Sequence, residues 1–109
     1  MSIAQELKFA HITSEQGLSM GAVNCILQDS RGFVWFGTQD GLNKYDGYSI
    51  TVFKHNQLDS NSLSNNFIYS LYEDKNNTLW IGTNGGGVDA FNLHTGKFTH
   101  YISKQNSNE

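Results

Sequence analysis

The sequence predicts an all-β fold made of two copies of one structural unit. Three observations predict it: a motif that recurs 45 positions later, apolar runs of only a few residues between turn-forming residues, and a near absence of helix signals. Only Ile3–Leu7 could supply a helical turn. A chain of 109 residues suffices for one modest core and is too short for two independent domains.

The repeated motif is the strongest signal in the sequence. DSRGFVWFGT begins at Asp29, and DKNNTLWIGT begins 45 positions later at Asp74. The tryptophans and threonines keep this offset, and the second copy gains one residue after the threonines. A period of this length is typical of repeat architectures. The motif residues are Asp29, Gly32, Trp35, Gly37 and Thr38 in the first copy, and Asp74, Asn77, Trp80, Gly82 and Thr83 in the second.

Each unit is expected to form a four-stranded antiparallel meander. Its short runs of β-branched and aromatic residues end at turn residues every few positions. The strands expected in the first unit are Val23–Gln28, Phe33–Thr38, Leu42–Asp46 and Tyr48–Lys54. The strands expected in the second unit are Phe67–Tyr72, Thr78–Thr83, Gly87–Asn92 and Lys97–Ile102.

The turn between the first and second strands has the same chemistry in both units. An aspartate side chain can accept hydrogen bonds from turn amides, so we expect Asp29 and Asp74 to close these hairpins. The last turn residue is Gly32 in one copy and Asn77 in the other. These two residue types best tolerate the positive φ that such hairpins need.

The apolar pattern predicts how the units pack. The first strand carries apolar residues on both faces and must be covered on both, whereas the fourth is more polar. Small sheets stacked face to face, with the most apolar strand innermost, are the blades of a β-propeller. We expect Trp35 and Trp80 to pack between adjacent blades, and Gly37 and Gly82 to allow close approach of the neighbouring backbone. A flat repetitive solenoid is the competing architecture.

The start of the chain carries a further repeat element. Leu7–Ile12 resembles Val52–His55, so we expect an extra N-terminal strand, the outer strand of a preceding blade. The expected divisions are an N-terminal segment (1–17), a first repeat (18–62), and a second repeat with the C-terminal tail (63–109).

Composition argues against several function classes. The formal net charge of −3 argues against electrostatic binding of nucleic acid, which needs clustered Lys and Arg. No apolar run approaches the roughly 20 residues of a membrane-spanning helix, and the first residues lack the basic and apolar regions of a signal peptide. Cys25 is the only cysteine, which excludes an internal disulfide and indicates a small buried hydrophobe.

No group of residues has the spacing of a catalytic or metal site. The histidines are His11, His55, His94 and His100. They form no metalloprotease pair, and Asp40-Gly41 and Asp46-Gly47 lack the pattern of a calcium loop. The glycines at 85–87 precede no phosphate-loop lysine, and a turn with positive φ explains them. We therefore expect no catalytic residue, no metal and no cofactor.

With its Gly-rich turn and a strand ending in Tyr45-Asp46 or Phe91-Asn92, the motif resembles the two-component regulator propeller repeat. The opening FAHITSEQGLSMGAVNCILQDSRGFVWFGTQDGLNKYDG is similar to the start of the sensor region of bacterial hybrid two-component sensor kinases. The resemblance covers residues 7 to 102. It implies a seven-bladed periplasmic propeller followed by another β-domain, a membrane helix and a histidine kinase. It also implies a role in sensing, often of oligosaccharides.

The loops at one end of such a propeller are the candidate ligand site. Loops that enter the first strand, and loops that join the second strand to the third, lie on one face around the central channel. Here they carry neutral amide and hydroxyl groups suited to sugar hydroxyls. Ordinary solvated turns are the alternative. The candidate ligand-binding residues are Ser19, Met20, Gln39, Asp40, Ser64, Asn65, Asn66 and Asn84.

The expected function is non-catalytic ligand sensing within a sensor kinase, without membrane contact by this segment. A protein-interaction scaffold and a propeller lyase are the alternatives. The lyase requires a histidine and an acid that converge on the channel, whereas the histidines map to rim strands and a rim turn. Two units leave large sheet faces uncovered, so we expect homo-oligomers that complete a ring, for example three or four chains with six or eight blades.

Overall fold

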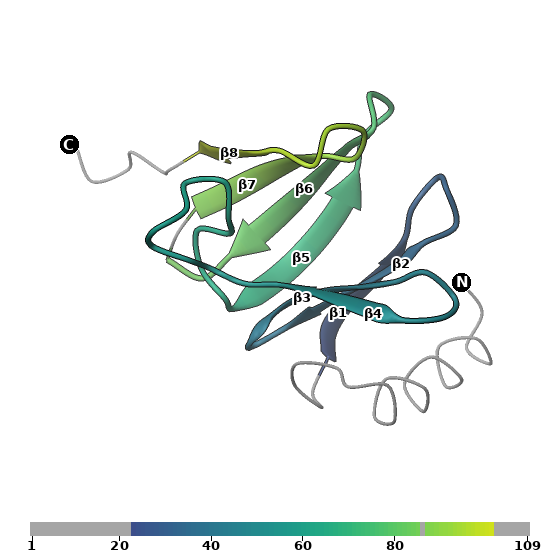
Figure 1. Ribbon diagram of the computed structural model, residues 1–109, viewed down its shortest axis with the longest axis horizontal. Helices are drawn as coiled ribbons and strands as arrows, with labels where there is room; N and C mark the ends of the chain where they lie inside the picture. Colours follow the sequence, from purple (N-terminus) through teal and green to yellow (C-terminus); the bar gives the residue numbers. More distant parts are fainter. Residues whose placement is uncertain (1–22, 86, 102–109) are drawn as a thin grey trace.

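Two four-stranded antiparallel sheets pack side by side in the computed structural model, which describes residues 23–85 and 87–101 (Figure 1). Each sheet follows chain order. Blade 1 consists of β1 (Val23–Gln28), β2 (Val34–Thr38), β3 (Gly41–Tyr45) and β4 (Ile50–Phe53). Blade 2 consists of β5 (Ile68–Glu73), β6 (Thr78–Thr83), β7 (Gly87–Asn92) and β8 (Phe98–Tyr101). The all-β fold with two four-stranded units is confirmed, while the expected extra strand Leu7–Ile12 and the C-terminal tail lie outside the described residues.

The outer strands are shorter than the sequence predicts. β4 begins at Ile50 because Oδ1 of Asp46 accepts hydrogen bonds from the amides of Tyr48 (2.9 Å) and Ser49 (2.8 Å) and holds them in a turn. These bonds, first the one from Ser49, lower the pKa of Asp46. In blade 2, Asn92 takes the place of Asp46 in an equivalent turn. A side chain that competes for backbone amides therefore delays the start of both outer strands.

The motif aspartates close the first hairpin of each blade and also bind the tryptophan. Oδ1 of Asp29 accepts two turn amides, at 2.9 and 3.0 Å, and its Oδ2 accepts the indole Nε1–H of Trp35 at 2.9 Å. Asp74 makes the same three bonds, including one from Trp80 at 2.9 Å. The bond from Trp80 is the first cause that lowers the pKa of Asp74. The turn bonds confirm the prediction, and the indole bond explains why the aspartate and the tryptophan recur together.

The remaining turn residues also have defined structural roles. Gly32 has a φ of 93° and Asn77 a φ of 63°, which confirms the left-handed conformation predicted for both. The hydroxyls of Thr38 and Thr83 each donate to the carbonyl oxygen of the glycine that starts the third strand, at 2.9 Å in both blades. The motif threonine therefore closes the second hairpin, as the aspartate closes the first.

The motif glycines make room for side chains, not for neighbouring backbone as the sequence analysis expected. A Cβ on Gly37 would lie 2.5 Å from Sγ of Cys25 and 2.6 Å from Cγ2 of Ile68 in blade 2, and a Cβ on Gly82 would collide with Oγ of Ser70. Cys25 and Ser70 are the register partners of the two glycines and follow an irregularity in the first strand. Each glycine, because it has no Cβ, thus leaves space for the side chain of its cross-strand partner.

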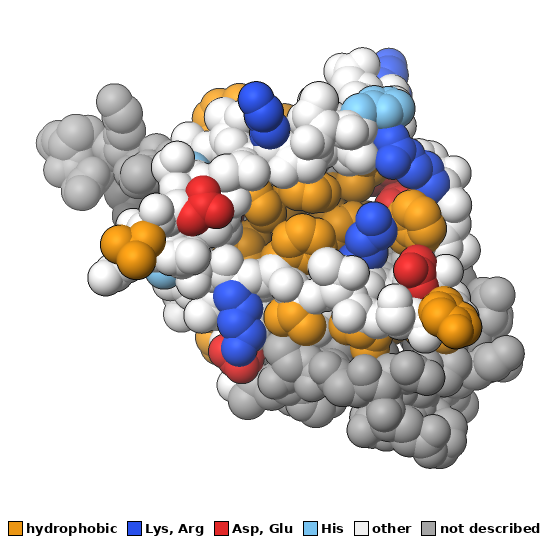
Figure 2. Space-filling view, viewed as in Figure 1, with side chains coloured by type: hydrophobic (Ala, Val, Ile, Leu, Met, Phe, Trp, Pro, Cys, Tyr) orange, Lys and Arg blue, Asp and Glu red, His pale blue; other side chains and the backbone are white. Residues whose placement is uncertain are grey.

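The main core fills the space between the blades. Trp35 is 1% exposed, stacks on Phe53 at 5.7 Å between ring centroids, and meets Phe91 of blade 2 edge-on, also at 5.7 Å. Phe91 in turn contacts Phe98 at 4.7 Å. Figure 2 shows hydrophobic side chains gathered along this seam. Each such aromatic pair contributes roughly 0.5–1.5 kcal/mol beyond its burial. The predicted packing of a motif tryptophan between blades is confirmed for Trp35.

Blade 2 leaves its other face open. Trp80 is partly exposed, and its ring meets Tyr101 of its own blade at 5.6 Å. Tyr72 is 64% exposed, Tyr101 52% and Val88 39%. We call Tyr72, Trp80, Val88 and Tyr101 the far face of blade 2. The expectation that Trp80 packs against an adjacent blade stays a prediction, because no further sheet follows blade 2 among the described residues.

The second strand, not the first, is the most buried element. All five residues of β2 are buried, whereas β1 and β5 carry exposed residues. β2 has a paired strand on each side, and its two faces belong to different clusters: Trp35 to the main core, Val34 and Phe36 to a second cluster with Tyr45. β1 and β5 lie at sheet edges, so the predicted coverage of both their faces is incomplete.

Candidate functional site

The candidate site lies at the end of the blades where the chain crosses from β4 to β5. We call residues 54–67 the connector. The amide of Gly41 donates to the carbonyl oxygen of Asn66 (2.7 Å), and Oδ1 of Asn66 accepts the amide of His55 (2.6 Å). The amide of Asn84 donates to the carbonyl oxygen of Phe67 (3.0 Å). The connector therefore meets the β2–β3 turn of blade 1 and the β6–β7 turn of blade 2, as the sequence predicts.

The described candidate residues share this end, and several hold the loops in place. Asp40 pairs with Lys54 at 3.0 Å with both side chains about half-exposed, so the pair contributes at most about 1 kcal/mol. Oδ1 of Asn65 accepts a hydrogen bond from the amide two residues later (2.9 Å). Gln39 and Asn84 are exposed in their turns. The two candidates outside the described residues are Ser19 and Met20.

A pocket of about 340 Å³ opens beside the connector, at the lower end of the size range of small-molecule sites. Ser62 and Leu63 are buried, whereas most of the surrounding residues are exposed. Nδ1 of His55 lies 2.6 Å from the carbonyl oxygen of Leu63, which fixes one side of the opening. The lining residues are His55, Asn56, Gln57, Asp59, Ser60, Ser62, Leu63, Ser64 and His100. Of these, only Ser64 is among the ligand-binding residues predicted from the sequence.

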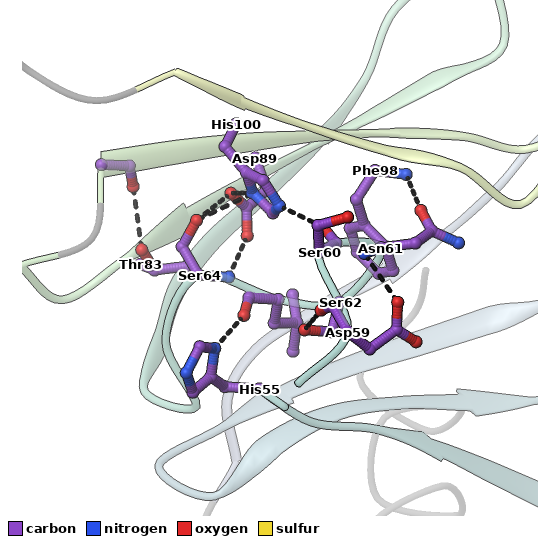
Figure 3. Close-up of polar contacts among 12 residues, drawn as sticks. His55, Asp59, Ser60, Asn61, Ser62, Ser64, Thr83, Asp89, Phe98 and His100 are labelled. Atoms are coloured by element: carbon purple, nitrogen blue, oxygen red, sulfur yellow. Dashed lines mark hydrogen bonds and ion pairs between the residues drawn. The ribbon is translucent and has the colours of Figure 1, made fainter. Parts of the chain in front are cut away.

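A buried carboxylate ties the connector to blade 2 beside this pocket (Figure 3). Asp89 of β7 is 0% exposed and accepts the amide (2.8 Å) and the hydroxyl (2.5 Å) of Ser64. Nδ1 of His100, its cross-strand partner in β8, lies 2.7 Å from the same carboxylate. The bond to Asp89, and then the bond to the carbonyl oxygen of Ser60 (2.9 Å), raises the pKa of His100. Ser64 is therefore held in a fixed position by a charged group.

Ser64, His100 and Asp89 differ from a catalytic triad. In a triad the serine and the acid engage opposite ring nitrogens of the histidine. Here Nδ1 of His100 faces both the Ser64 hydroxyl (2.9 Å) and Asp89 (2.7 Å), while Nε2 lies 2.9 Å from the carbonyl oxygen of Ser60. The serine hydroxyl donates to the carboxylate. This geometry positions the connector and does not activate a nucleophile.

His100 lies on an outer strand, β8, as predicted, whereas its partner Asp89 was not predicted as a site residue. Asp89 stands two positions before Phe91 in the same strand, so it shares the face of a core aromatic. A carboxylate at such a position needs hydrogen-bond partners, and this signal could have identified it. Its partner Ser64 lies 25 positions away on an irregular segment, where no pattern indicates the contact.

Other reactive groups in the described residues have structural roles. In residues 23–85 and 87–101, no three His, Cys, Asp or Glu side chains are grouped so as to hold a metal ion. Cys25 packs against the main core, and burial raises the pKa of its thiol to about 11, which makes it a poor nucleophile at neutral pH. Over the same residues, no helix is both long and apolar enough to span a membrane.

The two repeats match a known family model. The model, described as two component regulator propeller, matches residues 17–40 and 62–85. Each matched segment includes one complete copy of the Asp-to-Thr motif.

Similar proteins include a histidine kinase and the extracellular domains of putative two component and one component systems. Histidine kinase P4 of Formosa agariphila is 45% identical over 56 residues, which cover 51% of this chain and 4% of the kinase. The extracellular domain of a putative hybrid two component system from B. thetaiotaomicron has a TM-score of 0.76 and 36% identity, over 85% of this chain and 13% of that one. The extracellular domain of a putative one component system from the same organism has a TM-score of 0.62 and 30% identity, over 80% of this chain and 13% of that one. The chain thus spans a small part of each of these proteins.

Proposed function

Residues 17–40 and 62–85 are repeats of the two component regulator propeller family, and from this premise we propose that the chain is a non-catalytic, ligand-sensing propeller segment of a two-component sensor. One observation carries the proposal: the connector and the β2–β3 and β6–β7 turns meet at one end of the blades. The similarity to the extracellular domains of putative two component and one component systems supports an extracellular or periplasmic location.

Oligosaccharides are the proposed ligand class. The loops at this end carry the neutral side chains of Gln39, Ser64, Asn65, Asn66 and Asn84. Amide and hydroxyl groups can both donate to and accept from sugar hydroxyls. The amide oxygens of Asn65 and Asn66 hold the loop, at 2.9 and 2.6 Å from backbone amides, which leaves their NH₂ groups as donors for a ligand. Asn84 adds an exposed amide from blade 2. These groups would bind an uncharged polar ligand across both blades.

Calorimetry against a panel of neutral oligosaccharides tests this proposal. Asn84→Ala should weaken binding by roughly tenfold, the effect of one lost hydrogen bond. Asn76→Ala is the matched control, since Asn76 is equally exposed in the turn at the opposite end of β6. Absence of binding to every oligosaccharide, or equal weakening by both variants, would contradict the proposed site.

We also propose that copies of the chain associate to cover the far face of blade 2. The equivalent face of blade 1 is covered by blade 2, with Trp35 against Phe91, whereas Tyr72 and Tyr101 are more than half exposed. Exposed aromatic surface of this kind commonly marks an interaction site. The same face would serve the alternative function, a protein-interaction scaffold, if another protein covers it.

Light scattering at micromolar concentration separates these two cases. Self-association predicts a mass of several chains that Tyr72→Glu reduces to one. Leu58→Glu is the control, because Leu58 is 91% exposed on the connector and lies outside the far face. A monomeric mass for the unmodified chain would refute self-association through this face.

A further inference from the structure

Asp89 is the meeting point of three elements, and its environment differs from that of the same position in blade 1. It belongs to β7, binds Ser64 of the connector, and faces His100 of β8 (Figure 3). In blade 1 the corresponding cross-strand pair is Asn43 and Val52. The repeat therefore folds without an acid and a histidine at these positions, so the pair serves something particular to blade 2.

The ring of His100 is placed between two hydrogen-bond acceptors. Nδ1 lies 2.7 Å from the Asp89 carboxylate, and Nε2 lies 2.9 Å from the carbonyl oxygen of Ser60. A ring nitrogen donates only when it carries a hydrogen, so both bonds form together only in the doubly protonated, cationic ring. A neutral ring must give up either the bond to the strand or the bond to the connector.

The charged group in contact with His100 favours the cation. The charged or titratable side chains that face it are Asp89 from β7 and, across the pocket, Asp59 and His55 from the connector. Phe98 of its own strand stacks on the ring, at 6.4 Å with 6° between the planes, and carries no charge. The fully buried carboxylate of Asp89 is the charged group that His100 contacts, and it favours the cationic ring.

We propose that Asp89 and protonated His100 form a latch that fixes the connector on blade 2, and that loss of the His100 proton loosens the connector and residues 64–66. The latch itself does not depend on the proposed function. Only an effect of the loosened connector on ligand binding rests on it. The direction of the pH dependence follows from the raised pKa of His100. The stabilisation is complete at pH values below the unfolded-state pKa of about 6.5, and it is lost as pH rises through the higher folded-state pKa.

Hydrogen exchange of the Ser64 amide, which donates to Asp89, tests the latch in the full chain. Protection, corrected for intrinsic exchange, should fall roughly tenfold as pH rises through the titration midpoint of His100, as expected for the loss of one charge-assisted hydrogen bond. That midpoint is measured by NMR in the same sample and should lie above about 6.5. The amide of Asp74, bonded within the β5–β6 hairpin, is the internal control and should show no step.

Two histidine variants separate the latch from a general effect of pH. His100→Gln should abolish the step in Ser64 protection, whereas His94→Gln, at another exposed histidine, should retain it. Asp89→Asn should lower the midpoint of His100. A step that persists in His100→Gln, or a His100 midpoint below about 6.5, would overturn the proposal. A failure of oligosaccharide binding would leave these exchange results unchanged, so the two proposals fail separately.

Discussion

The two blades share one motif, yet the same tryptophan has different surroundings in each. Trp35 and Trp80 donate to their aspartates at the same distance, 2.9 Å, but Trp35 is 1% exposed between the blades while Trp80 lines an open pocket. The motif thus determines the hairpin locally, and the presence of a next blade determines what the indole ring contacts. In repeat proteins these two contributions to stability are separable, as intrinsic and interface terms.

Removal of the indole should give the largest difference in stability loss between the two blades. Trp35→Ala should lower the free energy of unfolding by about 3–5 kcal/mol, because the ring fills the main core. Trp80→Ala should cost about 1–2 kcal/mol, because its ring is partly exposed. Urea denaturation of both variants measures the two losses. Equal losses in dilute solution would refute the difference, and losses that converge as protein concentration rises would support association through the far face.

The motif glycines give a smaller contrast of the same kind. Gly37→Ala should cost about 1–3 kcal/mol, because the new methyl group meets Cys25 and Ile68 inside the seam between the blades. Gly82→Ala should cost less than about 1 kcal/mol, because it meets only the exposed Ser70, whose hydroxyl can rotate away. Chemical denaturation measures both. A more damaging Gly82→Ala would show that the far face is also tightly packed.

The first hairpin should behave alike in the two blades. Gly32→Ala should cost about 1 kcal/mol, because its φ of 93° strains any residue with a Cβ even though nothing lies within 4 Å. Asn77→Gly should change stability by less than about 0.5 kcal/mol, because Gly adopts positive φ readily. Thermal unfolding should show a shift of about 4–8 °C for the first variant and little for the second. A large loss in Asn77→Gly would mean that its side chain has a role beyond conformation.

The smallest expected effect is on acid stability. The pKa of Asp74 is lowered, first by the bond from Trp80, so this group stabilises the fold above its unfolded-state value of about 3.9. That contribution is lost as pH falls through the lower folded-state pKa. Asp74→Asn should therefore weaken the dependence of stability on pH below about 4. Urea midpoints measured from pH 2.5 to 6 check this, and an unchanged acid dependence would contradict it.

The features that the sequence predicts well are those made within one hairpin. The bounds of β1 and β6 agree with expectation, because alternation and turn residues determine them locally. The positive φ of Gly32 and Asn77 follows from residue type alone. The neighbours of Gly37 could not be predicted, because Ile68 reaches it from the other blade.

The candidate site was predicted at the level of loops and not of side chains. The meeting of the connector with Gly41 and Asn84 follows from propeller topology. The bonds of Asp89 to Ser64 and His100 join residues 25 and 11 positions apart. The Asp89–His100 pair stands where blade 1 has the pair Asn43 and Val52. A repeat alignment shows such a substitution, but only the packed structure shows which loop it holds.

The strand ladders of the described chain run only between neighbours in sequence, and no ladder joins one blade to the other. One repeat of the sequence therefore encodes one whole sheet. A duplication of about 45 codons, inserted at the connector, would add a whole blade without breaking an existing ladder. The new blade would bring an indole on one side and an apolar surface on the other. A gene of this kind can lengthen by in-frame duplication while each intermediate length keeps intact sheets.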